Sequence, residues 1–203
     1  MMKVLILRSV RSLFWALALM LTNPALLWAD ARSDGDLGIA EYRKGNLIEA
    51  MQLLEKSAAG GYVPAQTTLA YILDAAEMDA EAFRWYQKAA DSKDAAGLFG
   101  LGNMYAKGEG TKKDPHRAGQ LIRQAAQLEY LQAMHVYAHA LEHGELGFDT
   151  APQQAVEWYL RAARQGDQNS MQRLKQAYTL GQLGLAVDPQ QAAAWDKKIN
   201  QTE

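Results

Sequence analysis

The sequence contains no cysteine among its 203 residues. A chain without cysteine has no disulfide framework and no thiolate for a metal site or a nucleophile. Proline, the residue that most strongly interrupts helices, occurs only five times. The net charge of −2 excludes the strongly basic composition that is typical of nucleic-acid-binding proteins. These absences leave a helix-rich globular protein as the expected class.

The N-terminal region has the pattern of a secretory signal peptide. Lys3, Arg8 and Arg11 precede the apolar run LFWALALML at 13–21, and the small residues of ALLWADA at 25–31 follow it. The apolar run is too short to cross a membrane, because a spanning helix needs about 20 apolar residues. The pattern therefore favours a cleaved signal peptide over a membrane anchor.

Cleavage after Ala29 and cleavage after Ala31 both fit this pattern, and we prefer Ala29. We expect a signal peptide over residues 1–29 and a helical repeat domain over 30–203. Removal of the three basic residues of the signal peptide changes the net charge from −2 to −5, which argues against nucleic acid or anionic lipid as partner. Without a cysteine for lipid attachment, we expect a periplasmic protein that is not inserted in the membrane.

Internal repeats dominate the rest of the chain. The segments FRWYQKAADSKD (83–94), QLIRQAAQLEYL (120–131) and VEWYLRAARQGD (156–167) share two apolar residues, two polar or basic residues and an alanine pair. The alanines that precede the full and weaker copies are Ala50, Ala82, Ala118, Ala155 and Ala192, at spacings of 32, 36, 37 and 37 residues. Such a period predicts one helical hairpin repeated five times.

A second block, which ends in glycine, precedes the third, fourth and fifth copies. Its copies are GLFGLGNMYAKG (97–108), AMHVYAHALEHG (133–144) and SMQRLKQAYTLG (170–181). The last residues, Gly108, Gly144 and Gly181, can adopt the left-handed conformation that ends a helix. The second helices of the hairpins begin with signals of their own. The expected N-caps are Asn46, Asp79, Asp114 and Asp188, and the expected first-turn prolines are Pro115, Pro152 and Pro189.

The run LGNMYAKGEGTKKDPHRA at 101–118, together with the WY blocks at 85–90 and 158–163, resembles the Sel-like repeat family, relatives of the tetratricopeptide repeats. The resemblance covers residues 35–200. It implies an all-α fold, an α/α solenoid of about five antiparallel helical hairpins in a right-handed superhelix. It also implies an adaptor that binds other proteins. Bacterial members of the family are often exported, and some of them serve envelope assembly, polysaccharide export or motor function.

The resemblance further implies that the first helix of each hairpin lines a concave surface. In the segment 133–144, the packing positions Ala133, Tyr137 and Leu141 cluster on one side at about 100° per residue, whereas His135 and His139 point away from them. The candidate partner-binding residues at the corresponding positions are Thr67, Tyr71, Phe99, Asn103, His135, His139, Gln172 and Gln176. Their aromatic, amide and imidazole groups suit a protein partner.

The stretch HVYAHALEH at 135–143 places three histidines at four-residue intervals. Two of them could bind one metal ion from a single helix face, but the third lies about 12 Å from the first, and Glu142 is poorly aimed as a further ligand. A partner-binding or pH-responsive role and a merely solvated helix face are the other hypotheses. We expect no metal and no cofactor.

No catalytic motif emerges from the sequence. The segment GEGTKKD at 108–114 follows a helix rather than a strand, which argues against a phosphate-binding loop. No serine lies in a recognisable nucleophile motif. We predict a non-catalytic protein–protein interaction scaffold in the periplasm. The alternatives are an enzyme that binds or hydrolyses β-lactams, like the cysteine-rich branch of the family, and a histidine-mediated metal-binding protein.

Overall fold

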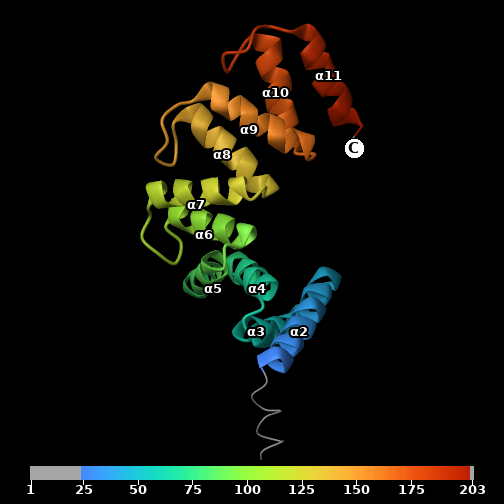
Figure 1. The fold of residues 1–203 in the computed structure, drawn as a ribbon, viewed down its shortest axis with the longest axis vertical. Coiled ribbons are helices and arrows are strands. Elements are labelled where there is room, and N and C mark those ends of the chain that lie inside the picture. Colours follow the sequence, from blue (N-terminus) through green and yellow to red (C-terminus); the bar gives the residue numbers. More distant parts are fainter. Residues whose placement is uncertain (1–23, 202–203) are drawn as a thin grey trace, which may run out of the picture. The chain divides into compact units, whose positions relative to one another are not determined.

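In a computed structural model that describes residues 24–201, the chain forms ten α-helices and no strand (Figure 1). The helices are α2 (Pro24–Lys44), α3 (Leu47–Ala59), α4 (Val63–Ala75), α5 (Asp79–Asp91), α6 (Ala95–Lys107), α7 (Pro115–Gln127), α8 (Leu131–His143), α9 (Pro152–Arg164), α10 (Gln168–Leu180) and α11 (Pro189–Asn200). Taken in pairs from α2, they are hairpins 1 to 5. The predicted all-α fold of five hairpins is confirmed.

The basic and apolar segments of the predicted signal peptide fall outside the described residues. None of the helices within residues 24–201 combines the length and the apolar character that crossing a membrane requires. The preferred and the alternative cleavage positions both fall inside α2.

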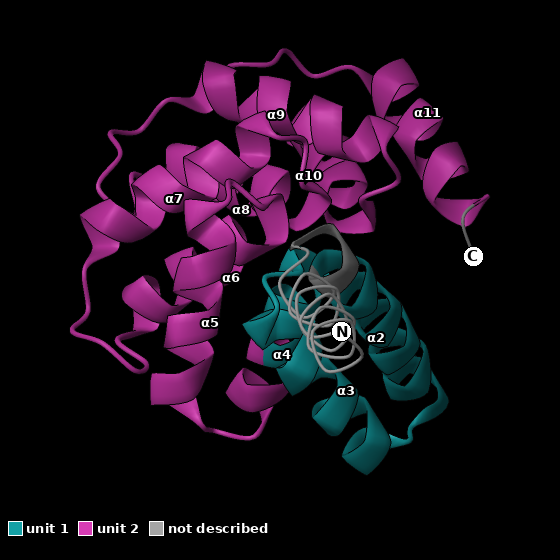
Figure 2. Cartoon of the chain, turned by 60° about the horizontal axis from the view of Figure 1, so that its bottom comes forward, with its two compact units in different colours: residues 1–69 teal, residues 70–203 magenta. Residues whose placement is uncertain are grey.

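The chain divides into two compact units, residues 1–69 and 70–203, and the boundary falls within α4 (Figure 2). In the first unit, α2 packs against α3. The buried hydroxyl of Ser57 donates a hydrogen bond of 2.5 Å to the carbonyl of Ala31. The hydroxyl of Tyr62 donates one of 2.6 Å to Asp36 Oδ1.

In the second unit, each helix from α5 to α10 packs against the helix that follows it. Figure 2 shows these helices as an arc in which α6, α8 and α10 lie on the inner side and α7 and α9 on the outer side. The alanine pairs of the repeat are all buried: Ala89, Ala90, Ala125, Ala126, Ala162 and Ala163. Small side chains at these positions let neighbouring helices approach closely, as the repeat pattern predicts.

The predicted helix ends are confirmed. Gly108, Gly144 and Gly181 follow the ends of α6, α8 and α10 with φ values of 89°, 69° and 67°, and each N–H bonds to a carbonyl of the last turn. This backbone conformation favours glycine because it has no Cβ. The prolines Pro115, Pro152 and Pro189 begin α7, α9 and α11, where their missing N–H costs no helical hydrogen bond.

Two of the four predicted N-caps differ from the prediction. Asp114 and Asp188 accept hydrogen bonds from backbone N–H groups of α7 and α11, as expected. Asp79 is instead the first residue of α5, after Met78, where its charge still favours the positive end of the helix dipole. Asn46 does occupy the cap position of α3, but its side chain donates a hydrogen bond of 2.6 Å to Glu41 Oε2 rather than capping the helix.

Candidate functional site

The eight candidate partner-binding residues lie on the first helices of hairpins 2 to 5, and none of them is fully buried. Thr67 belongs to the first unit, and the other seven belong to the second. Tyr71, His139, Gln172 and Gln176 are exposed, whereas Thr67, Phe99, Asn103 and His135 are half-buried. Six of the eight lie on α6, α8 and α10, the inner helices of the second unit: Phe99, Asn103, His135, His139, Gln172 and Gln176.

Phe99 is held by an aromatic neighbour from the following hairpin. Its ring centroid lies 5.4 Å from that of Tyr130, which precedes α8. Such ring pairs add stability beyond the burial of their surface. Phe99 is therefore half-buried beside a neighbouring ring, whereas Tyr71 is 55% exposed.

His135 contacts the fifth hairpin instead of projecting freely. Its Nδ1 lies 3.0 Å from Ser170 Oγ and 3.2 Å from Asp167 Oδ2, and its ring lies 5.7 Å from that of Tyr159. The three residues do not form a catalytic relay, because serine and aspartate approach the same ring nitrogen and Ser170 is fully buried. His135 thus joins two hairpins while 26% of its side chain stays exposed.

His139 and His143 lie one turn apart with stacked rings, whose centroids are 4.2 Å apart. Nδ1 of His139 lies 3.3 Å from Glu145 Oε2, and Nδ1 of His143 lies 3.0 Å from the carbonyl of His139. Across the described part of the chain, no three histidine or carboxylate side chains are arranged to bind a metal ion. The histidine stretch therefore divides into one residue at a hairpin junction and two on the accessible face.

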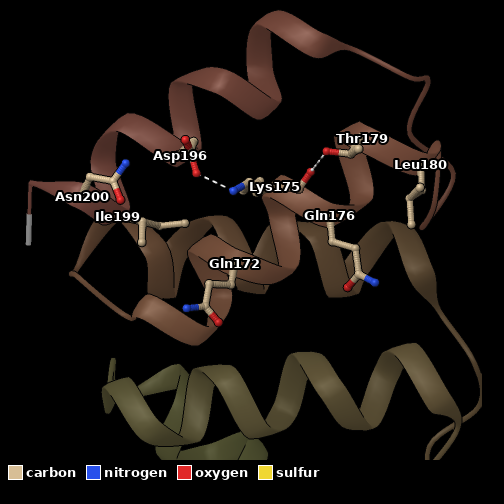
Figure 3. Close-up of a pocket in the computed structure, with 8 residues that line it drawn as sticks. All are labelled: Gln172, Lys175, Gln176, Thr179, Leu180, Asp196, Ile199 and Asn200. Carbon is tan, nitrogen blue, oxygen red and sulfur yellow. Dashed lines mark hydrogen bonds and ion pairs between the residues drawn. The ribbon is translucent and has the colours of Figure 1, made fainter.

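Gln172 and Gln176 line a pocket of about 530 Å³ on hairpin 5 (Figure 3). Lys175 lies beside them and forms an ion pair with Asp196 of α11, and Ile199 contributes an apolar wall. Asp196 occupies the place of the tyrosine in the WY block, and its ion pair keeps this part of the hairpin polar. The pocket offers amides, one ion pair and a small apolar surface.

A buried ionic network lies at the junction of hairpins 4 and 5. Arg173 of α10 donates to both carboxylate oxygens of Glu142, with Nη2–Oε1 at 2.6 Å and Nε–Oε2 at 3.1 Å. Tyr159 donates a hydrogen bond of 2.9 Å to Glu142, and Arg173 Nη1 donates one of 3.0 Å to Gln182 Oε1. The side chains of Glu142 and Arg173 are only 12% and 19% exposed, so bulk water screens the pair weakly.

This network controls the ionisation of its members. Burial opposes the charge on Glu142, but the hydrogen bonds from Arg173 and Tyr159 outweigh it and lower the pKa of this carboxyl below its usual value. Burial and the bond to Glu142 raise the pKa of Tyr159. Sequence reasoning considered Glu142 only as a metal ligand and missed Arg173. The sequence does contain a signal for Arg173, because this arginine replaces an apolar or small residue in the middle of a first helix.

The repeated hairpins, buried alanine pairs and glycine-closed first helices define an α/α repeat solenoid of the tetratricopeptide-like class. The family model for the Sel1 repeat matches residues 34–62, 79–94, 95–130, 131–167 and 176–197. The chain therefore belongs to the Sel1 repeat family, as the sequence resemblance predicts. Sel1 repeat proteins generally mediate protein–protein interactions and are usually non-catalytic scaffolds.

Two solved structures share this architecture, and a curated protein is similar in sequence. A Sel1 repeat protein from Oxalobacter formigenes is 29% identical, with a TM-score of 0.77 over 85% of this chain and 74% of that one. The protective antigen c5321 of uropathogenic Escherichia coli is 28% identical, with a TM-score of 0.71 over 84% of this chain and 38% of that one. The chitin synthase regulator SKT5 of Saccharomyces cerevisiae is 30% identical over 62% of this chain, which spans 19% of its length.

Proposed function

We propose that the chain is an exported, non-catalytic scaffold that binds a protein partner along the inner surface formed by α6, α8 and α10. The observation that carries the proposal is the contrast between buried and exposed side chains along these helices. Ala133, Tyr137 and Leu141 of α8 are buried, whereas His139 is exposed. A surface with aromatic, amide and imidazole groups on a rigid repeat array suits a peptide or a protein segment.

Export to the periplasm rests on the N-terminal pattern of basic residues, an apolar run and small residues. The packing of α2 supports cleavage after Ala29 rather than after Ala31. Ala31 is only 5% exposed, and its carbonyl accepts the hydrogen bond from Ser57, so cleavage after Ala31 would remove a packed residue. We expect the intact mass of the protein from a periplasmic fraction to correspond to a chain that begins at Asp30; full-length protein in the cytoplasm would contradict export.

Site-specific photo-crosslinking in the native cell tests the binding surface. A photoreactive amino acid at His139 or Gln176, both exposed on inner helices, should capture a partner. The same amino acid at Gln120 of α7 or Glu157 of α9, both exposed on outer helices, provides matched controls. Crosslinks from the inner positions alone would support the proposal. Equal capture from the outer positions, or none from the inner ones, would overturn it.

A further inference from the structure

A second pocket, of about 500 Å³, lies where α4, α5 and α6 meet. We call it the Asp74 pocket, and its lining residues are Tyr71, Asp74, Ala75, Glu77, Asp79, Lys107 and Glu109. Lys107 Nζ lies 3.1 Å from Glu109 Oε2. The side chain of Asp74 makes no hydrogen bond or ion pair with any residue that the structure describes. The pocket thus contains more carboxylates than cations.

The ionisation of Asp74 reflects this imbalance. Burial raises the pKa of its carboxyl above the ordinary value. The ammonium of Lys107 opposes this effect, whereas the carboxylates of Glu109 and Asp79 add to it. Any further cation that enters the pocket stabilises the ionised form of such a carboxyl.

The repeat register shows which group occupies the equivalent place elsewhere in the same chain. Asp74 is the twelfth residue of α4, as Glu142 is the twelfth of α8. Glu109 and Gln182 each follow the glycine that closes the first helix of the next hairpin. Between Glu142 and Gln182 lies the guanidinium of Arg173, bonded to both. Asp74 and Glu109, the counterparts of Glu142 and Gln182, both line the Asp74 pocket.

The chain does not supply that guanidinium at the Asp74 pocket. The residue of α6 that corresponds to Arg173 is Gly100, the sixth residue of its helix. A Cβ atom at Gly100 would overlap the ring of Tyr86, so no longer side chain fits there unless Tyr86 moves. These hairpins supply the ammonium of Lys107, but a guanidinium in the equivalent place has to come from outside them.

We propose that the Asp74 pocket binds the guanidinium of an arginine side chain of the partner protein. Arginine fits better than lysine because its planar fork can bridge two acceptors from different hairpins, as Arg173 bridges Glu142 and Gln182. The exposed ring of Tyr71 at the pocket adds an aromatic face, which attracts a guanidinium. This inference rests on the proposed scaffold function and specifies the chemistry of the partner.

Binding can be measured without the partner, by NMR titration of the ¹⁵N-labelled protein with N-acetyl-arginine amide. We expect saturable shifts of the amide signals of Asp74, Glu109 and Gly110. The neutral citrulline analogue, which has the same shape without the charge, should produce none. Equal responses to the two compounds at these amides would overturn the inference.

Three variants make the test specific. Asp74→Asn should weaken arginine binding by about threefold or more, because the neutral amide removes the charge of an accessible ion pair. Lys107→Gln should tighten binding because it removes the competing ammonium. Asp91→Asn, the same change at an exposed residue of α5 outside the pocket, should leave the affinity unchanged. Equal affinities for Asp74→Asn and Asp91→Asn would contradict the inference.

The outcome separates this inference from the proposed function. If inner-surface crosslinking captures a partner but arginine does not bind, the scaffold stands and the arginine inference fails. If arginine binds but no partner is captured, the pocket is a guanidinium site and the inner surface is not the interface.

Discussion

Two hairpin junctions of this chain use the same register positions but different interactions. Between hairpins 4 and 5, these positions are Glu142, Tyr159 and Arg173, which form a hydrogen-bonded ionic network. Between hairpins 3 and 4, the same positions are Ala106, Ile122 and Val136, where Ile122 is 1% exposed. The repeat therefore fixes the geometry of a junction and leaves its chemistry free to vary.

The junction of hairpins 2 and 3 is intermediate between these two. It has a carboxylate and a tyrosine, Asp74 and Tyr86, but Gly100 replaces the arginine. A buried polar network stabilises a fold when each member has its partners, and it is costly when one is missing. This difference is seen in the pKa values of the two carboxyls. The pKa of Asp74 is raised, whereas the hydrogen bonds from Arg173 and Tyr159 lower that of Glu142.

The largest effect is expected at the apolar junction. Ile122→Ala should lower the free energy of unfolding by about 3 kcal/mol, because it removes buried methyl groups and leaves a cavity. Urea unfolding at low and at high salt should give the same loss, since no charge is involved. A loss below about 1 kcal/mol would show that Ile122 does not support the junction.

At the ionic junction, Arg173→Ala should lower the free energy of unfolding by about 2 kcal/mol, because it leaves Glu142 without its charged hydrogen-bond donor. The matched control is Arg84→Ala, whose exposed pair with Glu81 spans 4.0 Å and should contribute less than about 0.5 kcal/mol. Equal losses for the two variants in urea unfolding would contradict the buried network.

Acid should distinguish the junctions further. The pKa of Glu142 is lowered in the folded state, so its stabilising contribution is complete above the pKa of the unfolded chain. That contribution is lost as the pH falls through the folded value. Glu142→Gln should therefore lose less stability than the wild type between neutral pH and this acidic range, as measured by urea unfolding at each pH. An equally steep loss would show that other carboxyls account for the acid sensitivity.

The smallest effect is expected at the incomplete junction, and its sign is opposite. The pKa of Asp74 is raised in the folded state, so the folded chain gains stability as the pH falls through that value. At neutral pH, Asp74→Asn should stabilise the protein slightly, within about 0.5 kcal/mol. A clear destabilisation in thermal unfolding would mean that Asp74 already has a cationic partner.

The sequence predicted the fold in detail because each signal acts locally. Glycine at a helix end, proline in a first turn and alanine pairs at a fixed period each constrain backbone or packing without reference to distant residues. Asp79 shows the limit of such signals, because an aspartate suits both the cap and the first helical position.

The candidate site was less predictable because its contacts join different hairpins. The helical angle of His135 was consistent with an outward direction, but its bond to Ser170 depends on how α10 packs against α8. Glu142 and Arg173 are 31 residues apart, and no local pattern links them. Gly100 has a meaning only beside the other junctions, because it occupies the register position that Arg173 has in α10.

One measurement tests the equivalence of the two places most directly: NMR titration of the Arg173→Ala variant with N-acetyl-arginine amide. The wild type should show saturable shifts around Asp74 and Glu109 alone. The variant should show a second set around Glu142 and Gln182, because its own guanidinium has been removed. If the variant gains no second set, or if neither protein responds around Asp74, the two places are not equivalent guanidinium sites.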